Sequence, residues 1–189
     1  MKADFINYLI SLHKVNSLFE IGCGDGFQSS LFSSDCNYVG TDISDVVISR
    51  NIDQWHDHRK FIMYNTYKSD RGNYIAEMTL SLDVIIHITQ LADFIDHIND
   101  LTNSSSRFIC IYSSAFSHDS RQSFAYMRSW DVVSAFKLLK PEIKLVHYWA
   151  NPAPYIENVS NDQETSVCDF FVFEKSRLDL DVPARYWSP

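Results

Sequence analysis

Short apolar runs alternate with segments of helical periodicity along most of this chain. Apolar residues at positions 5, 9, 10 and 12, and again between 88 and 101, recur close to every 3.6 positions, the period of a helix. The predicted helices span residues 5–12, 26–32, 46–51, 88–101 and 123–139. Runs with the length and β-branched or aromatic content of strands span residues 17–21, 37–41, 60–64, 79–84, 107–112, 143–149 and 167–174.

The alternation of strands and helices predicts the fold class. Strands joined by helices form a parallel sheet that is covered on both faces. The last two strands have no helix between them, so we expect a hairpin and an antiparallel edge strand there. The sequence therefore predicts an α/β fold with a single doubly wound, mostly parallel seven-stranded sheet. A length of 189 residues suits one domain over residues 1–189.

Composition narrows the choice of partners. The net charge of -8 arises from 16 Lys and Arg against 24 Asp and Glu, which disfavours a polyanion such as nucleic acid as the partner. No apolar stretch approaches the roughly 20 residues of a membrane helix, and the start has no signal-peptide pattern. The four cysteines form no C-x-x-C pair, which suits buried thiols in a reducing cytoplasm. His56 and His58 are better explained as surface residues than as a metal pair, so no metal site is predicted.

A glycine-rich segment stands where the first strand ends. Residues 18–26 read Leu-Phe-Glu-Ile-Gly-Cys-Gly-Asp-Gly and run into a predicted helix. Glycine allows close backbone approach and positive φ angles, and the helix start offers free N–H groups. A nicotinamide-binding loop requires a third glycine where this chain has Phe27, which disfavours an oxidoreductase. A turn without chemical meaning is the plain alternative.

The segment resembles the first motif of class I S-adenosylmethionine-dependent methyltransferases, E/D-x-G-x-G-x-G. The likeness covers about residues 15–112, which would form the cofactor half, with residues 113–189 as the acceptor half. It implies S-adenosylmethionine as the cofactor, with its aminoacyl end held by the loop. The loop residues matched for this role are Glu20, Gly22, Cys23, Gly24 and Gly26.

Further cofactor contacts follow the next strands in the order typical of this family. Asp42 ends the second strand, where a carboxylate can accept both ribose hydroxyls. Its alternative role is to cap the next helix. The resemblance implies contacts from Ile43 beside it and from Asn65 after the third strand, where the family often has an acidic residue. It also places Ser81 and Leu82 of the fourth strand beside the methionine part and the acceptor.

The acceptor half carries weaker signals. His118 and Asp119 follow the fifth strand, where one can act as a general base, although a polar turn explains them equally well. His87 is either a third catalytic candidate or a buried histidine. Arg128 is a candidate for orienting an acidic group of the substrate. Several aromatic residues of this half can stack on a sugar ring, although some of them must belong to the core: Phe116, Phe124, Tyr126, Trp130, Tyr148, Trp149 and Tyr155.

Together these signals predict methyl transfer to a small polar acceptor, with a sugar hydroxyl preferred. The alternatives are a nucleic-acid methyltransferase that works with a partner and a cofactor-binding protein without catalysis. Residues 151–155, Asn-Pro-Ala-Pro-Tyr, are similar to the N/D-P-P-Y motif of amino-group methyltransferases. That motif belongs after the fourth strand, so a loop is the better interpretation.

Overall fold

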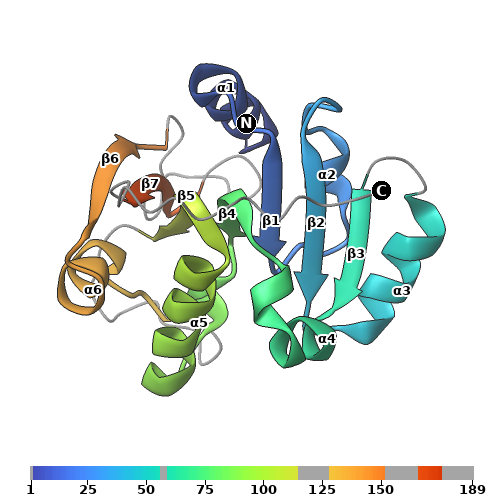
Figure 1. Cartoon of the computed structure of the whole chain (residues 1–189). Coiled ribbons are helices and arrows are strands. Elements are labelled where there is room, and N and C mark those ends of the chain that lie inside the picture. The colour runs from blue at the N-terminus through green and yellow to red at the C-terminus, as the bar shows by residue number, and fades with distance from the viewer. Residues whose placement is uncertain (1, 56–58, 115–127, 152–165, 176–189) are drawn as a thin grey trace.

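The computed structural model describes residues 2–55, 59–114, 128–151 and 166–175 (Figure 1). The helices are α1 (Lys2–His13), α2 (Phe27–Ser30), α3 (Asp45–Gln54), α4 (Tyr64–Ser69), α5 (Leu91–Asn103) and α6 (Val132–Leu139), with short 3-10 turns η1 (Arg71–Asn73) and η2 (Ile85–His87). The strands are β1 (Ser17–Ile21), β2 (Asn37–Asp42), β3 (Arg59–Met63), β4 (Ala76–Leu82), β5 (Ser105–Ser114), β6 (Ile143–Trp149) and β7 (Cys168–Lys175).

The seven strands form one sheet in the order β3-β2-β1-β4-β5-β7-β6. Strands β1 to β5 pair in parallel, and β7 pairs antiparallel with both β5 and β6. This confirms the predicted mostly parallel sheet with an antiparallel pair at one edge. Within this pair, β7 is the strand that runs antiparallel to its neighbours, and β6 is the outermost strand of the sheet. The strand order reverses between β1 and β4, and open α/β sheets bind ligands at such a point beyond the carboxyl ends of the strands.

Helices cover both faces of the sheet, as predicted, because successive side chains of a strand point to opposite faces. Leu18 of β1 packs in one apolar cluster with α1 and α3, whereas its neighbour Phe19 packs in the other with α4, α5 and α6. Figure 1 shows α4 and α5 next to each other on this second face. Each buried Leu, Ile or Phe contributes about 1.5–3 kcal/mol, so both faces stabilise the sheet.

Two local predictions need correction. The third strand ends at Met63, and the unpredicted helix α4 begins at Tyr64, because six residues are too few to show a clear helical period. The predicted helix 123–139 begins only at Val132 within the described residues. Asp131 sets this start, since its side chain accepts a hydrogen bond of 2.9 Å from the Ser134 N–H, as an N-cap does. Residues 123–127 lie outside the described part.

Among the described residues, no helix is both long enough and apolar enough to cross a membrane.

Candidate functional site

The segment after β1 forms a tight loop at the carboxyl end of the sheet. Gly22, Gly24 and Gly26 all have positive φ, at 87°, 53° and 74°. Side chains rarely adopt these angles, which explains why glycine stands at alternate positions. The N–H groups of Gly22 and Cys23 both donate to the Thr41 carbonyl, at 2.7 and 3.0 Å, and so fix the loop against the end of β2.

The surroundings of two loop glycines differ. A Cβ atom on Gly22 would lie 2.2 Å from Cγ2 of Val84, so this glycine packs tightly against the segment after β4. A Cβ atom on Gly24 would meet no described atom within 4 Å. The main chain at Gly24 therefore borders open space, where a ligand can approach the backbone closely.

Asp42 joins the loop to the end of β2. One carboxylate oxygen, Oδ2, accepts a hydrogen bond of 3.0 Å from the Gly24 N–H. The other, Oδ1, accepts one of 2.9 Å from the Ser44 N–H. A carboxylate has about four acceptor sites, so each oxygen can still accept one more donor. Ser44, not Asp42, caps α3: its side chain accepts from the Val47 N–H.

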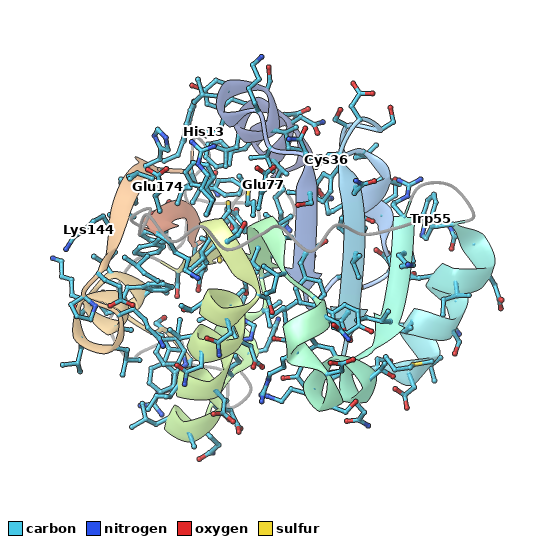
Figure 2. The ribbon with its side chains drawn as sticks, in the orientation of Figure 1. His13, Cys36, Trp55, Glu77, Lys144 and Glu174 are labelled. Atoms are coloured by element: carbon cyan, nitrogen blue, oxygen red, sulfur yellow. The ribbon has the colours of Figure 1, made fainter. Side chains whose placement is uncertain are left out.

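Two residues of α3 and its end secure the loop from the other side. Asn51 is 1% exposed, and its Nδ2 donates 2.8 Å to the Gly24 carbonyl. Trp55, labelled in Figure 2 at the end of α3, donates from Nε1 to the Asp25 carbonyl at 3.3 Å. Sequence reasoning missed both residues. The only signal was a polar residue on the buried side of the predicted helix 46–51.

Glu20 lies directly before the loop, on the face of β1 that α1 covers. It is 3% exposed and accepts a hydrogen bond of 2.5 Å from the Tyr38 hydroxyl. Burial raises the pKa of Glu20 to about 7, whereas the Tyr38 hydrogen bond and the positive charge of Lys2 act to lower it. The Glu20 carboxyl thus changes charge near neutral pH, beneath the loop.

The other predicted cofactor contacts lie at the same end of the sheet. Ile43 directly follows β2 and is 82% exposed, and Asn65 is exposed in the first turn of α4, directly after β3. Leu82 is buried at the end of β4. The hydroxyl of Ser81 is bonded to Nε2 of His97 on α5 at 2.8 Å, so a ligand contact from Ser81 falls to its backbone.

The end of β4 carries a further polar group that the sequence prediction left out. Asp83 has φ of 62°, a rare value for a residue other than glycine, and its carboxylate forms an ion pair with Lys2 of α1. Strained backbone of this kind often occurs at functional positions. The Asp83 N–H donates 3.0 Å to the Tyr112 carbonyl, and the Tyr112 hydroxyl accepts 3.0 Å from Nδ2 of Asn151. These groups line the side of the loop toward β5.

The predicted acceptor residues are placed only in part. His118 and Asp119 lie outside the described residues. His87 is exposed on η2, not buried. Arg128 lies beside this turn, because its N–H donates to the Ile86 carbonyl and Nη1 to the Thr89 carbonyl, at 2.8 and 2.9 Å.

The described aromatic candidates differ in how far they are exposed. Trp130 is 8% exposed and stacks on Phe94 with ring centroids 4.3 Å apart, so it belongs to the core. Trp149 is half exposed and contacts Phe5 of α1, and Tyr148 donates 2.8 Å to Asp169. Trp130 is therefore one of the aromatic residues that belong to the core rather than to a sugar-stacking surface. Phe116, Phe124, Tyr126 and Tyr155 lie outside the described residues.

Known proteins share this architecture. Magnesium protoporphyrin IX methyltransferase from Synechocystis PCC 6803 with bound SAH has a TM-score of 0.67 at 13% identity, covering 93% of this chain and 82% of its own. The methyltransferase domain of bacterial CtHen1-C has a TM-score of 0.65 at 12% identity, with 92% and 96% covered. The N-methyltransferase NodS from Bradyrhizobium japonicum WM9, in complex with S-adenosyl-l-homocysteine, has a TM-score of 0.64 at 13% identity, with 93% and 86% covered. At these identities the likeness establishes a shared fold.

Comparison with protein families identifies the family of this chain as well as its fold. The family described as methyltransferase domain matches residues 2–152. This range includes the glycine loop, Asp42 and the segment after β4. No curated protein matches the chain.

Proposed function

The chain belongs to the family of methyltransferase domains, and from this premise we propose that it methylates a small polar acceptor, preferably at a sugar hydroxyl. It is an S-adenosylmethionine-dependent methyltransferase, as the E-x-G-x-G-x-G motif indicates. Residues 1–112 form the proposed cofactor half and residues 113–189 the acceptor half of one domain.

The geometry around Asp42 is the observation that carries the cofactor site. The carboxylate keeps one acceptor site on each oxygen, which is what two ribose hydroxyls need. The Gly24 N–H donates a hydrogen bond of 3.0 Å to this carboxylate, so the open space at Gly24 lies next to Asp42. S-adenosylmethionine has no pyrophosphate, so the acidic side chains of Asp25 and Asp42 do not oppose its binding. The residues present thus fit this cofactor.

The remaining contacts extend this arrangement along the carboxyl ends of the strands. Gly22, Cys23, Gly24 and Gly26 present main chain to the aminoacyl end, with Glu20 beneath them. Ile43 offers an exposed apolar side chain for the adenine ring, and Asn65 offers an amide. Ser81 and Leu82 border the side that faces the acceptor.

Methyl transfer places modest demands on this site. The bound sulfonium supplies a methyl carbon that is already activated for in-line displacement. The protein aligns the acceptor with that carbon, and a base accepts the acceptor's proton where the reaction requires it. We assign the base to His118 or Asp119, with His87 as the third candidate, and we assign an orienting role to Arg128.

Polar groups at the ends of β4 and β5 support a small polar acceptor. Asp83 is partly exposed there, with 35% of its side chain accessible. The hydroxyls of Ser113 and Ser114 are buried and have no hydrogen-bond partner among the described residues. The net charge of -8 opposes a polyanionic macromolecule, so a hydroxylated metabolite suits this surface better than nucleic acid.

Two experiments test the proposal. Titration calorimetry with S-adenosylmethionine and, separately, with reduced nicotinamide cofactors tests the cofactor, and we expect only the first to bind. The protein is then incubated with methyl-labelled S-adenosylmethionine and with RNA, DNA, protein and small-metabolite fractions of the host. Label in the metabolite fraction supports the proposal, whereas label confined to RNA or DNA contradicts it. Binding without transfer to any fraction would indicate a cofactor-binding protein without catalysis.

The base assignment has its own test. A His118→Ala, Asp119→Ala double variant should bind S-adenosylmethionine as the wild type does and transfer the methyl group much more slowly. A matched Asp93→Ala variant, changed on the exposed first turn of α5, should retain the wild-type rate. Full activity of the double variant contradicts the assignment even where the acceptor class is correct.

A further inference from the structure

A titratable carboxyl group lies beneath the proposed cofactor loop and has no part in the transfer step described above. Glu20 is 3% exposed and accepts a hydrogen bond of 2.5 Å from the Tyr38 hydroxyl. It stands two residues before Gly22 on β1, so any change in its charge acts directly under the loop.

Charged and titratable groups of α1, β2, β5 and the glycine loop act on Glu20. Lys2 of α1 brings a positive charge and favours the ionised carboxylate, whereas Asp42 of β2 brings a negative charge and opposes it. Tyr38 of β2 donates its hydroxyl hydrogen. The thiols of Cys23 and Cys110 have their pKa values raised by burial and remain neutral. Lys2 is also paired with Asp83, so cationic and anionic groups already oppose each other here, and the charge of a bound ligand adds to their effect on Glu20.

The donor and the product of methyl transfer differ in charge. S-adenosylmethionine carries a sulfonium, an ammonium and a carboxylate, and so has a net positive charge. S-adenosylhomocysteine has lost the sulfonium charge and is neutral overall. A positive charge favours an ionised carboxylate nearby, most strongly in surroundings with little water.

We propose that Glu20 distinguishes the methyl donor from the product by charge, because the cationic donor favours the ionised carboxylate more strongly than the neutral product does. This inference rests on the proposed function. At and below neutral pH, donor binding releases a proton from the fraction of Glu20 that is protonated, and that fraction takes the proton back when the sulfonium charge is lost. The protons balance over one cycle, and the protonated form no longer favours a cationic ligand.

The affinity for the donor is expected to fall at acid pH. Because burial raises the pKa of free Glu20 to about 7, the carboxylate is ionised above that pH and binds the donor without proton release. Below it, donor binding must first expel a proton, so donor affinity falls as the pH falls. The neutral product does not require ionised Glu20, so its affinity changes less. The preference for donor over product therefore weakens toward acid pH.

Titration calorimetry of the intact chain tests this, with S-adenosylmethionine and S-adenosylhomocysteine at about pH 8 and about pH 5.5. Buffers with different heats of ionisation reveal released protons. We expect proton release with the donor near pH 7, and a ratio of donor to product affinity about tenfold lower at acid pH. A tenfold change corresponds to a Glu20 pKa about one lower in the donor complex.

Variants separate Glu20 from the cofactor's own titrating groups. Glu20→Gln keeps the shape and an acceptor for Tyr38, and its affinity ratio should not change with pH. Glu77→Gln, changed at the amino end of β4, should behave as the wild type. Tyr38→Phe removes the hydrogen bond that lowers the Glu20 pKa, so the transition should move to higher pH. The Tyr38→Phe variant keeps the inference testable where Glu20→Gln does not fold.

The outcomes are distinguishable. A wild-type ratio that is the same at both pH values, or a pH-dependent ratio that persists in Glu20→Gln, overturns the inference and leaves the proposed function intact. Failure of both ligands to bind at either pH overturns the proposed function and this inference with it.

Discussion

The main-chain N–H of Gly24 donates a hydrogen bond of 3.0 Å to the carboxylate of Asp42, eighteen residues further along the chain. This bond connects the loop after β1 with the end of β2. It places the proposed aminoacyl contact and the proposed ribose contact in one unit. A change at either residue therefore affects the site in a way that can be measured separately from folding.

The first prediction concerns Gly24. A methyl group added there meets no described atom within 4 Å, but it extends into the space assigned to the cofactor. In Gly24→Ala we expect S-adenosylmethionine affinity to fall at least tenfold. The left-handed backbone at φ of 53° costs about 1–2 kcal/mol, so the fold should survive. Calorimetry measures the affinity, and thermal unfolding monitors the fold.

Gly72→Ala is the matched control, since its added methyl also meets nothing, within η1 away from the loop. Gly22→Ala should instead lower the stability of the fold, because its methyl group would lie 2.2 Å from Cγ2 of Val84. Wild-type affinity in a folded Gly24→Ala protein would show that the cofactor does not approach this backbone.

The second prediction concerns Asp42. Asp42→Asn keeps the shape but removes the charge that strengthens hydrogen bonds to the ribose hydroxyls, each worth about 1.5–3 kcal/mol. We expect the affinity for S-adenosylmethionine to fall at least tenfold. Asp45→Asn, three residues away on the exposed start of α3, should bind as the wild type does. A crystal structure of the complex with Asp42 turned away from the ribose would refute the assignment.

The strands and the glycine loop were predictable because their signals are local. Alternating apolar runs define β1 to β5 within a few residues, and Gly22, Gly24 and Gly26 stand at positive φ within one short segment. The position of Asp42 at the end of the second strand was predictable in the same way, whereas its contact with the ribose stays a prediction. Such features depend on neighbours in sequence, so one sequence reveals them.

The supports of the site were not predictable. Asn51 reaches Gly24 across 27 residues, and Trp55 reaches Asp25 across 30. The local pattern marks Asn51 as a polar residue on the buried side of α3, but it does not show that Asn51 or Trp55 contacts a loop formed much earlier in the chain. Helix α4 was missed for a different reason, since its six residues complete fewer than two turns.

The third prediction concerns the buried pair of Ser81 and His97. Burial lowers the pKa of His97 to about 4, so the ring is neutral near pH 7. Its Nε2 forms a hydrogen bond of 2.8 Å with the Ser81 hydroxyl. Ser81→Ala or His97→Leu alone leaves one buried polar group without its partner, at a cost of about 1–3 kcal/mol. The double variant should cost less than the sum.

Urea unfolding of the four proteins measures this coupling. Because the Ser81 hydroxyl faces α5, Ser81→Ala should also keep S-adenosylmethionine affinity within about twofold of wild type. Additive losses of stability would show that the two side chains do not act as a pair. A large loss of affinity in Ser81→Ala would show that the hydroxyl serves the cofactor.

The fourth prediction concerns pH and the contact between α1 and the edge strand. Nε2 of His13 lies 3.1 Å from Nε2 of His147, so one ring must donate and the other accept. Burial, then His147, then Arg107 lower the pKa of His13 below its ordinary value of 6.5, and Glu174, near it in Figure 2, acts in the opposite direction. The folded state therefore favours a neutral ring.

A histidine whose pKa is lower in the folded state contributes stability above the unfolded pKa and loses it as the pH falls through the folded one. The contribution of His13 to the free energy of unfolding should therefore decrease between about pH 7.5 and about pH 5.5. Because Glu20 and His97 also titrate, urea titrations measure this contribution as the difference between the wild type and a His147 variant. His147→Gln keeps a hydrogen-bonding partner for His13 without a second charge, so its decrease should be smaller. His87→Gln, changed at an exposed histidine, should match the wild type. Equal pH dependence in all three proteins would mean that the pair of His13 and His147 contributes nothing to it, since Glu20 and His97 titrate alike in each of them.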